Sequence, residues 1–430
     1  MRGRRRVSTD VGNRLLDCLH QDPAHTGRTP WATVTVDEWA ALFALARTHH
    51  VEALLAFRLR SRGIESRLPE AARAAALDAR QRGARSALLA QESLARLTTT
   101  LQTQGVSVIV LKGGHLAHVV YPRPSLRWML DVDLLVPRAD LTRAAALLRA
   151  QGYGQNAPSD DEGGSSAYPW HLPRFVKAHR PSVELHWRLA ANDLPPQGDL
   201  WERAVPVRIA GVETRGLCPV DLLLHLCVHG CYAHRFVMGL RPICDIAETV
   251  RHYGDTLAWA DVEARARRYG WHRGVYLMLR LAKEMLGAAV PDEVLRARPS
   301  GDLDHAVRTA RFLILEGNQI GRGLPAGVAS VSTATTWPGR IRAFGRSLFV
   351  PTAALARDFR VSPRSPRLLL YSMRVRDLLK RHGPVVVRLL RRDPTLTPIA
   401  RDVATIQQWL SDGERSGATD GTDKNKTDSV

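Results

Sequence analysis

The chain has 430 residues, of which 45% are hydrophobic, and its formal net charge is +19, from 61 Lys and Arg against 42 Asp and Glu. This composition excludes collagen-like and wholly disordered chains, and the length allows one large domain or two to three ordinary ones. The excess of positive charge favours polyanionic partners, namely nucleic acid, a membrane surface or nucleotide phosphates, although a general preference for Arg would give the same charge.

The cysteines and the hydropathy pattern bear on the compartment. Five cysteines are an odd number in a long chain, unlike the disulfide framework of a secreted protein. No uninterrupted apolar run approaches the roughly 18 residues that a membrane span requires. We therefore expect a cytoplasmic protein without a transmembrane segment.

The first quarter of the chain predicts helices after a polar start. Residues 1–35 are polar and contain proline, apart from a short apolar pattern at Leu15, Leu16 and Leu19, so we expect a polar N-terminal segment there. Residues 36–104 predict a helical region, because Ala, Leu, Arg and Gln dominate and leucines recur at helical spacing.

Residues 105–218 change to an α/β pattern. The β-branched run at 106–111 predicts a buried strand, and residues 131–136 predict a second one. Further elements expected here are a short helix at 115–121, a helix at 140–152, a polar mobile loop at 154–169, and strand-like pieces at 174–178, 183–187 and 205–209.

The remainder of the chain predicts helices followed by a polar end. We expect a helical region at 219–300, a basic helical C-terminal region at 301–400, and a mostly disordered tail at 401–430, where apolar residues become few. Between Arg360 and Arg392 the basic residues interleave with leucine and valine. This pattern favours a helix packed on the core with a solvated basic face, and the alternative is a helix that binds nucleic acid or a membrane surface.

The strand at 131–136 carries two carboxylates on one face. Because alternate strand residues point to the same side, Asp131 and Asp133 face one way, while Val132, Leu134 and Val136 face the core. Two carboxylates about 7 Å apart at the backbone repel each other unless a cation lies between them. Magnesium suits this arrangement, and the repulsion predicts that Asp133→Asn costs the metal-free protein no stability.

Two further elements strengthen the case for a phosphate and metal site. Lys112, Gly113 and Gly114 follow the first strand and open a helix, which offers backbone N–H groups and a cation to a phosphate. Glu184 and His186 share one face of the strand at 183–187, and a carboxylate on a neighbouring strand would complete a two-metal phosphoryl-transfer site. Taken singly, an ordinary turn, a solvated lysine and an edge-strand glutamate would explain these residues.

These residues belong to a longer pattern in the chain. It comprises Val110–Gly114, Tyr121, Arg127, Asp131–Val136, Gly152, Tyr153, Val183–Trp187, His225, His229, His234, Asp245 and Ile246. In this pattern the chain resembles the uncharacterised nucleotidyltransferase family of the polymerase-beta-like superfamily, over roughly residues 35 to 290. The resemblance implies an α+β fold, with a small mixed β-sheet nucleotidyltransferase core flanked by N- and C-terminal helical regions.

The resemblance also implies roles for the two acid motifs and the glycine turn. Asp131, Asp133 and Glu184 would be the catalytic metal triad, holding one or two Mg2+ ions. Gly113 and Gly114 would lie near the triphosphate of the NTP donor.

Other positions of the pattern are expected around the donor and the acceptor. Lys112 and Arg127 match family positions that we expect to contact phosphate, and we expect His186 and His229 beside the acceptor pocket. The turn of the superfamily usually carries Ser after its first glycine, and Gly114 occupies that place here. This departure predicts the loss of a hydroxyl contact to the phosphate.

Residues 225–234 also permit a zinc interpretation, because His225 and His229 lie one helical turn apart, as do Cys227 and Cys231. The two pairs point to different faces of the helix, so a single ion could not bind all four. We favour buried free cysteines and a histidine near the acceptor pocket.

Together these patterns favour a metal-dependent enzyme that transfers a nucleoside monophosphate from an NTP to a hydroxyl or phosphate acceptor and releases pyrophosphate. The acceptor could be a small molecule, a peptide or protein side chain, or an RNA end. One alternative is a non-catalytic nucleotide- or RNA-binding protein on the same fold, which Gly114 favours. Another is a metal-dependent glycosyltransferase, against which the Lys112–Gly114 turn argues.

Overall fold

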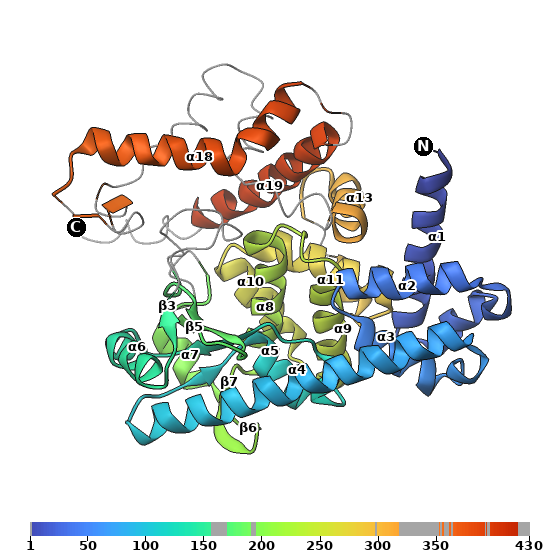
Figure 1. Ribbon diagram of the computed structural model, residues 1–430, viewed down its shortest axis with the longest axis horizontal. Coiled ribbons are helices and arrows are strands. Elements are labelled where there is room, and N and C mark those ends of the chain that lie inside the picture. The colour runs from blue at the N-terminus through green and yellow to red at the C-terminus, as the bar shows by residue number, and fades with distance from the viewer. Residues whose placement is uncertain are drawn as a thin grey trace, which may run out of the picture.

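The computed structural model describes residues 2–155, 170–190, 195–296, 299–317, 352, 355–356 and 361–419, except 363, 392, 394 and 395. In this part of the chain a mixed β-sheet lies between helical layers, and long helices extend beyond it (Figure 1). The expected α+β class, a small sheet core with helical flanks, is confirmed.

The described residues form a seven-stranded sheet in the order β3-β4-β5-β2-β1-β7-β6. The pairs β2–β5 and β1–β7 are parallel, and the other neighbouring pairs are antiparallel. The strands are β1 (Ile109–Val110), β2 (Asp131–Leu135), β3 (Gly154–Gln155), β4 (Phe175–Val176), β5 (Ser182–His186), β6 (Val205–Ile209) and β7 (Val212–Gly216). The last strand was not expected from the sequence, and it follows β6 through a tight turn in which Gly211 has a φ of +79°.

Side chains of β2 alternate between two layers of the structure. Val132, Leu134 and Val136 are buried against α4 (Glu70–Thr103) and α6 (Leu141–Ala150), as the alternation predicts. Leu135 points the opposite way, into the main helical core. Asp131 and Asp133 have the same parity as Leu135, so the carboxylates lie between the sheet and that core.

Helix α4 is 34 residues long and joins the sheet to α2 (Val36–Thr48) and α3 (Glu52–Ser61) (Figure 1). Small residues at its buried positions allow this close contact. At Gly83 an added Cβ would lie 2.4 Å from the backbone oxygen of Ser125 and 3.0 Å from Cβ of Ala53. The helix therefore packs against both the sheet and the N-terminal helices.

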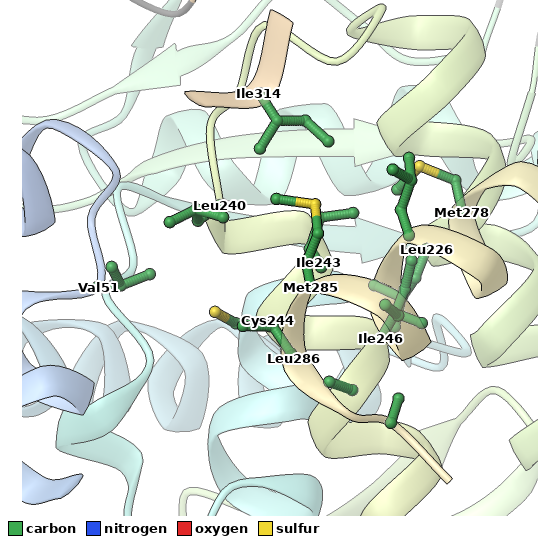
Figure 2. Close-up of a cluster of buried hydrophobic side chains, with 14 of the residues drawn as sticks. Val51, Leu226, Leu240, Ile243, Cys244, Ile246, Met278, Met285, Leu286 and Ile314 are labelled. Carbon is green, nitrogen blue, oxygen red and sulfur yellow. The ribbon is translucent and has the colours of Figure 1, made fainter. Parts of the chain in front are cut away.

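The main helical core is formed around α8 (Pro219–Val228), α9 (Arg241–Tyr253) and α11 (His272–Leu286). Figure 2 shows Leu226, Ile243 and Met278 from these helices, with Val51 before α3 and Ile314 of η10 in the same cluster. One continuous core thus connects the N-terminal helices with the helices that follow the sheet.

The start of the chain differs from the expected polar segment. Residues Arg2–Leu19 form helix α1, and its apolar residues from Val11 onward lie in the main helical core. The short apolar pattern around Leu15 is one face of an amphipathic helix. The expectation of a polar segment at 1–35 is wrong in this respect.

The C-terminal helices are α13 (Leu303–Phe312), α18 (Arg367–Leu390) and α19 (Leu396–Thr419), and α19 packs on α11 and α13. Its buried residues are Leu396, Ile399, Ala400, Val403, Ile406, Trp409 and Leu410. The prediction of a mostly disordered tail from residue 401 is therefore wrong for 401–410, because these apolar residues pack on the neighbouring helices. The expected mobile loop at 154–169 is wrong at its start, where Gly154–Gln155 form β3. Its remaining residues 156–169, residues 420–430 and most of 318–360 lie outside the described residues.

The other helical elements of the described chain are short. They are η1 (Pro23–Arg28), η2 (Trp31–Thr33), η3 (Glu65–Arg67), α5 (Lys112–His115), η4 (Leu116–Val120), η5 (Pro124–Leu126), η6 (Arg138–Asp140), α7 (Gln197–Arg203), η8 (His229–Ala233), η9 (Gly254–Thr256), α10 (Trp259–Arg268), α12 (Asp292–Arg296) and η10 (Leu313–Gly317). Among the residues that the structure describes, no helix has the length and apolar character needed to cross a bilayer.

Replacing Trp409 by Ala tests whether α19 is part of the folded core. Trp409 is 9% exposed, the guanidinium of Arg273 lies 5.3 Å from its ring centre, and Arg273 Nη1 donates to its backbone oxygen at 2.5 Å. Losing the ring leaves a cavity, so we expect a decrease of about 3 kcal/mol in the free energy of unfolding, measured by urea denaturation. Leu368→Ala, at a side chain that is 84% exposed on α18, is the control and should change it by less than about 0.5 kcal/mol. Equal effects of the two variants would contradict the docking of α19.

Candidate active site

Pairing between β2 and β5 determines the geometry of the candidate site. The parallel register places Asp133 beside Glu184, and Leu135 beside His186. Asp133, Glu184 and His186 are all buried. The structure therefore brings together two of the three expected acids and one of the expected histidines.

A lysine ammonium and an imidazole lie between the two buried carboxylates. Lys112 Nζ is 2.8 Å from Oδ1 of Asp133 and 3.7 Å from Oε2 of Glu184. His186 Nε2 is 3.0 Å from the same Asp133 oxygen and 3.3 Å from the same Glu184 oxygen. Arg174 donates to the other oxygen of Glu184, at 3.0 Å. The expectation that Lys112 contacts phosphate differs from this arrangement, in which its ammonium pairs with the carboxylates.

These contacts neutralise the buried acids. Burial raises the pKa of Asp133 and of Glu184, but the Lys112 charge and the His186 hydrogen bond outweigh burial, so both pKa values lie below their ordinary values. Burial lowers the pKa of Lys112, yet Asp133 and Glu184 outweigh it and raise that pKa above its ordinary value. Both carboxylates are therefore ionised and stabilised without an added ion.

Asp131 lies in a different electrostatic environment. It is half-buried at the start of β2, opposite Ser182. Burial, followed by the charges of Asp133 and Glu184, raises the pKa of its carboxyl to about 6. The sequence predicts repulsion between Asp131 and Asp133. Of these two carboxyls, only that of Asp131 has a raised pKa.

The glycine turn shows why Gly114 stands where the superfamily usually has Ser. Gly113 and Gly114 lie in the first turn of α5, which continues into η4. A Cβ at Gly114 would lie 2.7 Å from Cγ1 of Val110 and 3.2 Å from Cδ2 of Leu94. A side chain at position 114 would thus meet α4 and not the carboxylates. The glycine meets a packing requirement, so its lack of a hydroxyl gives no ground for expecting a lost phosphate contact.

Arg127 also differs from its expected role as a phosphate contact. Its Nε and Nη2 donate to Oδ1 and Oδ2 of Asp245 at 2.6 and 2.8 Å, and Tyr121 donates to the same Oδ1 at 2.8 Å. Arg127 Nη1 donates to the backbone oxygen of Trp128 at 2.5 Å. The guanidinium therefore fastens the loop before β2 to α9, in a buried bidentate ion pair.

Three histidines, in α8, in η8 and directly after η8, lie within electrostatic range of Lys112. Burial, and then the Lys112 charge, lowers the pKa of His225 to about 3 and that of His234 to about 4, and places that of His229 well below its ordinary value. His229 and His234 are joined by a 3.1 Å contact between their Nε2 atoms. All three are neutral imidazoles near the acidic cluster, and the place of His229 beside an acceptor pocket stays a prediction.

One group of three potential metal ligands stands out in the described chain. Ligand atoms of Asp133, Glu184 and His186 all lie within 4.8 Å of one another. Carboxylates suit Mg2+ and Mn2+, whereas an imidazole is more typical of Zn2+ or Fe2+, so the residues fit a divalent ion without selecting Mg2+. Asp131 lies outside this group. The third ligand is His186, where the sequence suggested Asp131. The cysteines and histidines of the zinc interpretation form no such group among the described residues.

Two basic residues near the acids were not expected from the sequence. Arg174 pairs with Glu184, and Arg241 of α9 is buried within electrostatic range of Asp131. Burial, and then the charge of Arg127, lowers the pKa of Arg241 to about 10. Neither stands in a recognisable motif, and only the general excess of arginine could have suggested them.

Paired substitutions test the electrostatic difference between Asp131 and Asp133. The sequence predicts no loss of stability for Asp133→Asn in the metal-free protein, but the ion pair with Lys112 reverses this expectation. In chelator at pH 7, Asp133→Asn should lower the free energy of unfolding by about 3 kcal/mol, because Lys112 loses its closest partner. Asp131→Asn should instead raise it by about 1–3 kcal/mol, because a carboxyl whose pKa rises from 3.8 to about 6 on folding opposes folding when ionised. Denaturant titrations measure both.

The pH dependence provides the control for Asp131. Its ionisation destabilises the fold fully above the folded pKa, and this effect disappears below the unfolded pKa. The advantage of Asp131→Asn should therefore decline between about pH 6 and pH 3.8. A destabilised Asp131→Asn, or an Asp133→Asn as stable as the wild type, would contradict the assignment.

Replacing Gly114 by Ser tests the packing explanation. We expect a loss of about 1–3 kcal/mol in the free energy of unfolding, because the new side chain meets Val110 and Leu94. Gly154→Ser is the control, since a Cβ there has open space around it. Thermal denaturation measures stability, and titration with Mg-ATP measures affinity. A stable Gly114→Ser protein with tighter nucleotide binding would show that the position faces the phosphate.

Comparison with known proteins places this geometry in a family. A family described as "Uncharacterised nucleotidyltransferase" matches residues 35–287, more than half of the chain. The match begins at Thr35, the N-cap of α2, and ends at Gly287, the C-cap of α11, so it contains the whole sheet and the main helical layer. No curated protein and no solved structure matches the chain. The chain belongs to the family of uncharacterised nucleotidyltransferases.

Proposed function

We propose that this protein transfers a nucleoside monophosphate from an NTP to a hydroxyl or phosphate acceptor, with Mg2+ and release of pyrophosphate, as in the polymerase-beta-like superfamily. The observation that carries the proposal is the parallel pairing of β2 with β5, which holds Asp133 beside Glu184 in a buried site with basic neighbours. Adjacent carboxylates of this kind are what metal-assisted phosphoryl transfer requires.

The acids have separate tasks in this proposal. Asp133, Glu184 and His186 would hold a divalent ion, and Asp131 would complete the acid set at its more exposed edge, where a second ion is possible. The ion, when bound, supplies positive charge that neutralises the phosphates. The acceptor oxygen bonds to the α-phosphorus, the bond from that phosphorus to the leaving oxygen breaks, and the acceptor proton passes to Asp131.

Basic residues around the acids would bind the triphosphate of the donor. Lys112 and Arg174 pair with the carboxylates, and Arg241 is buried on the side of Asp131. We propose that these three residues contact the phosphates, beside the backbone of Gly113 at the start of α5. Arg241 thereby takes the role that the sequence suggested for Arg127.

We propose that the acceptor binds near the neutral histidines. His225, His229 and His234 are uncharged near neutral pH, so they can donate or accept one hydrogen bond at each ring without repelling Lys112. Such a lining suits a hydroxyl-bearing acceptor, whether a small molecule, a protein side chain or an RNA end. The alternative, a non-catalytic protein on the same fold, drew its support from Gly114. The close packing of Val110 and Leu94 around that residue gives the glycine a structural reason and so supports the catalytic proposal.

Pyrophosphate release and thermal stability together test the function. We expect the wild type to release pyrophosphate from at least one NTP in the presence of Mg2+, with ATP included in the panel. Mg2+ and that NTP together, at about 100 times the dissociation constant, should stabilise the protein by roughly 2.7 kcal/mol, while either alone does much less. Asp133→Asn should reduce pyrophosphate release by several orders of magnitude, because it loses a metal ligand.

A buried carboxylate elsewhere provides the matched control. Asp221 pairs with Arg203 at 2.9 Å and with Arg265 at 3.0 Å, so Asp221→Asn removes a similar ion pair without touching the site. It should lose stability yet retain pyrophosphate release and stabilisation by Mg-NTP. Equal stabilisation of the wild type by NTP in excess chelator, or full activity of Asp133→Asn, would refute the metal site.

A further inference from the structure

A cation that lies against both paired carboxylates is a residue of the chain itself. Lys112 contacts Asp133 and Glu184, and its side chain is only 12% exposed. The chain has six lysines among its 61 Lys and Arg residues, and the other 55 are arginine. Lysine has a compact ammonium where arginine has a broad planar group, so it fits a position between two carboxylates that a metal ion could also take.

The backbone at this lysine is strained. Lys112 has a φ of +40°, in the left-handed region that residues with a side chain seldom adopt. Such conformations persist where the surrounding structure enforces them, and they gather at functional sites. Here the strained residue is the first residue of α5, which begins just after β1, where the chain turns from the sheet into the helix.

Lys112 and a divalent ion need the same two carboxylates. Asp133 and Glu184 supply two of the three ligands in the candidate metal group, and both contact the ammonium. A metal ion without nucleotide must therefore compete with a positive charge already in place. A triphosphate offers that ammonium new oxygens, so a bound nucleotide removes the competition.

We propose that Lys112 is the resident counter-ion of the carboxylate pair, which excludes a divalent ion from it until the phosphates of a nucleotide draw the ammonium away. This inference rests on the proposed function, because it takes the donor to be an NTP. It makes Lys112 a positioning residue that couples metal binding to nucleotide binding.

Binding of Mn2+ without nucleotide tests the proposal. Lys112→Met removes the charge and keeps the length of the side chain, and Lys112→Gln also keeps a hydrogen-bond donor for Asp133. Mn2+ affinity, measured by electron paramagnetic resonance and calorimetry, should rise about tenfold or more in both variants relative to the wild type. The additional gain in Mn2+ affinity caused by ATP should become smaller in both.

The control is a lysine–carboxylate pair away from the site. Lys283 Nζ lies 2.6 Å from Asp292 in an exposed ion pair, so Lys283→Met removes a lysine charge from a carboxylate elsewhere and should leave Mn2+ affinity unchanged. Variants of Lys112 that fold only when Mn2+ is present would also support the proposal, because the ion then replaces the ammonium.

Three results would overturn the proposal. They are unchanged Mn2+ affinity in the Lys112 variants, weaker Mn2+ binding, and failure of both variants to fold even with Mn2+. Pyrophosphate release by the wild type decides the proposed function separately. A wild type without transferase activity, together with tighter Mn2+ binding by the variants, would refute the enzyme and leave the counter-ion role intact.

Discussion

The structure depends on the neutralisation of two carboxylates that lie buried side by side on adjacent parallel strands. Backbone pairing of β2 and β5 forces Asp133 next to Glu184, and burial makes their charge costly. Lys112, His186 and Arg174 offset this cost through direct contacts. The same arrangement leaves the pair ready to exchange one cation for another, which is the chemical basis of the proposed activity.

The surrounding layers hold this cluster in place from two directions. On one side of the sheet, Val110 of β1 and Leu94 of α4 lie so close to position 114 that an added Cβ would meet both side chains. On the other side, Arg127 and Tyr121 bind Asp245 of α9, which secures the loop that leads into β2. Gly114 and Arg127, which the sequence suggested as phosphate contacts, therefore have packing and ion-pair roles. They support the segments that position Asp131 and Asp133.

Much of the fold was predictable because its signals are local. Strand alternation correctly divided Val132 and Leu134 from the acids, and it placed Glu184 and His186 on one face, since these are consequences of backbone geometry alone. The amphipathic face of α1 and the apolar row of α19 were missed, because polar residues around them lower the average hydrophobicity. Their burial depends on partner helices distant in the chain.

The sequence by itself determined which residue types the site contains, the alternation that groups the acids, and the membership of the chain in a nucleotidyltransferase family. The tertiary structure decided the partner of each charge: Lys112 with the acids, Arg127 with Asp245, and His186 within ligand distance of Asp133 and Glu184. The physical reason is that electrostatic energy depends on distance and burial. Neither is a property of a residue's position in the chain until strands and helices remote in sequence have packed together.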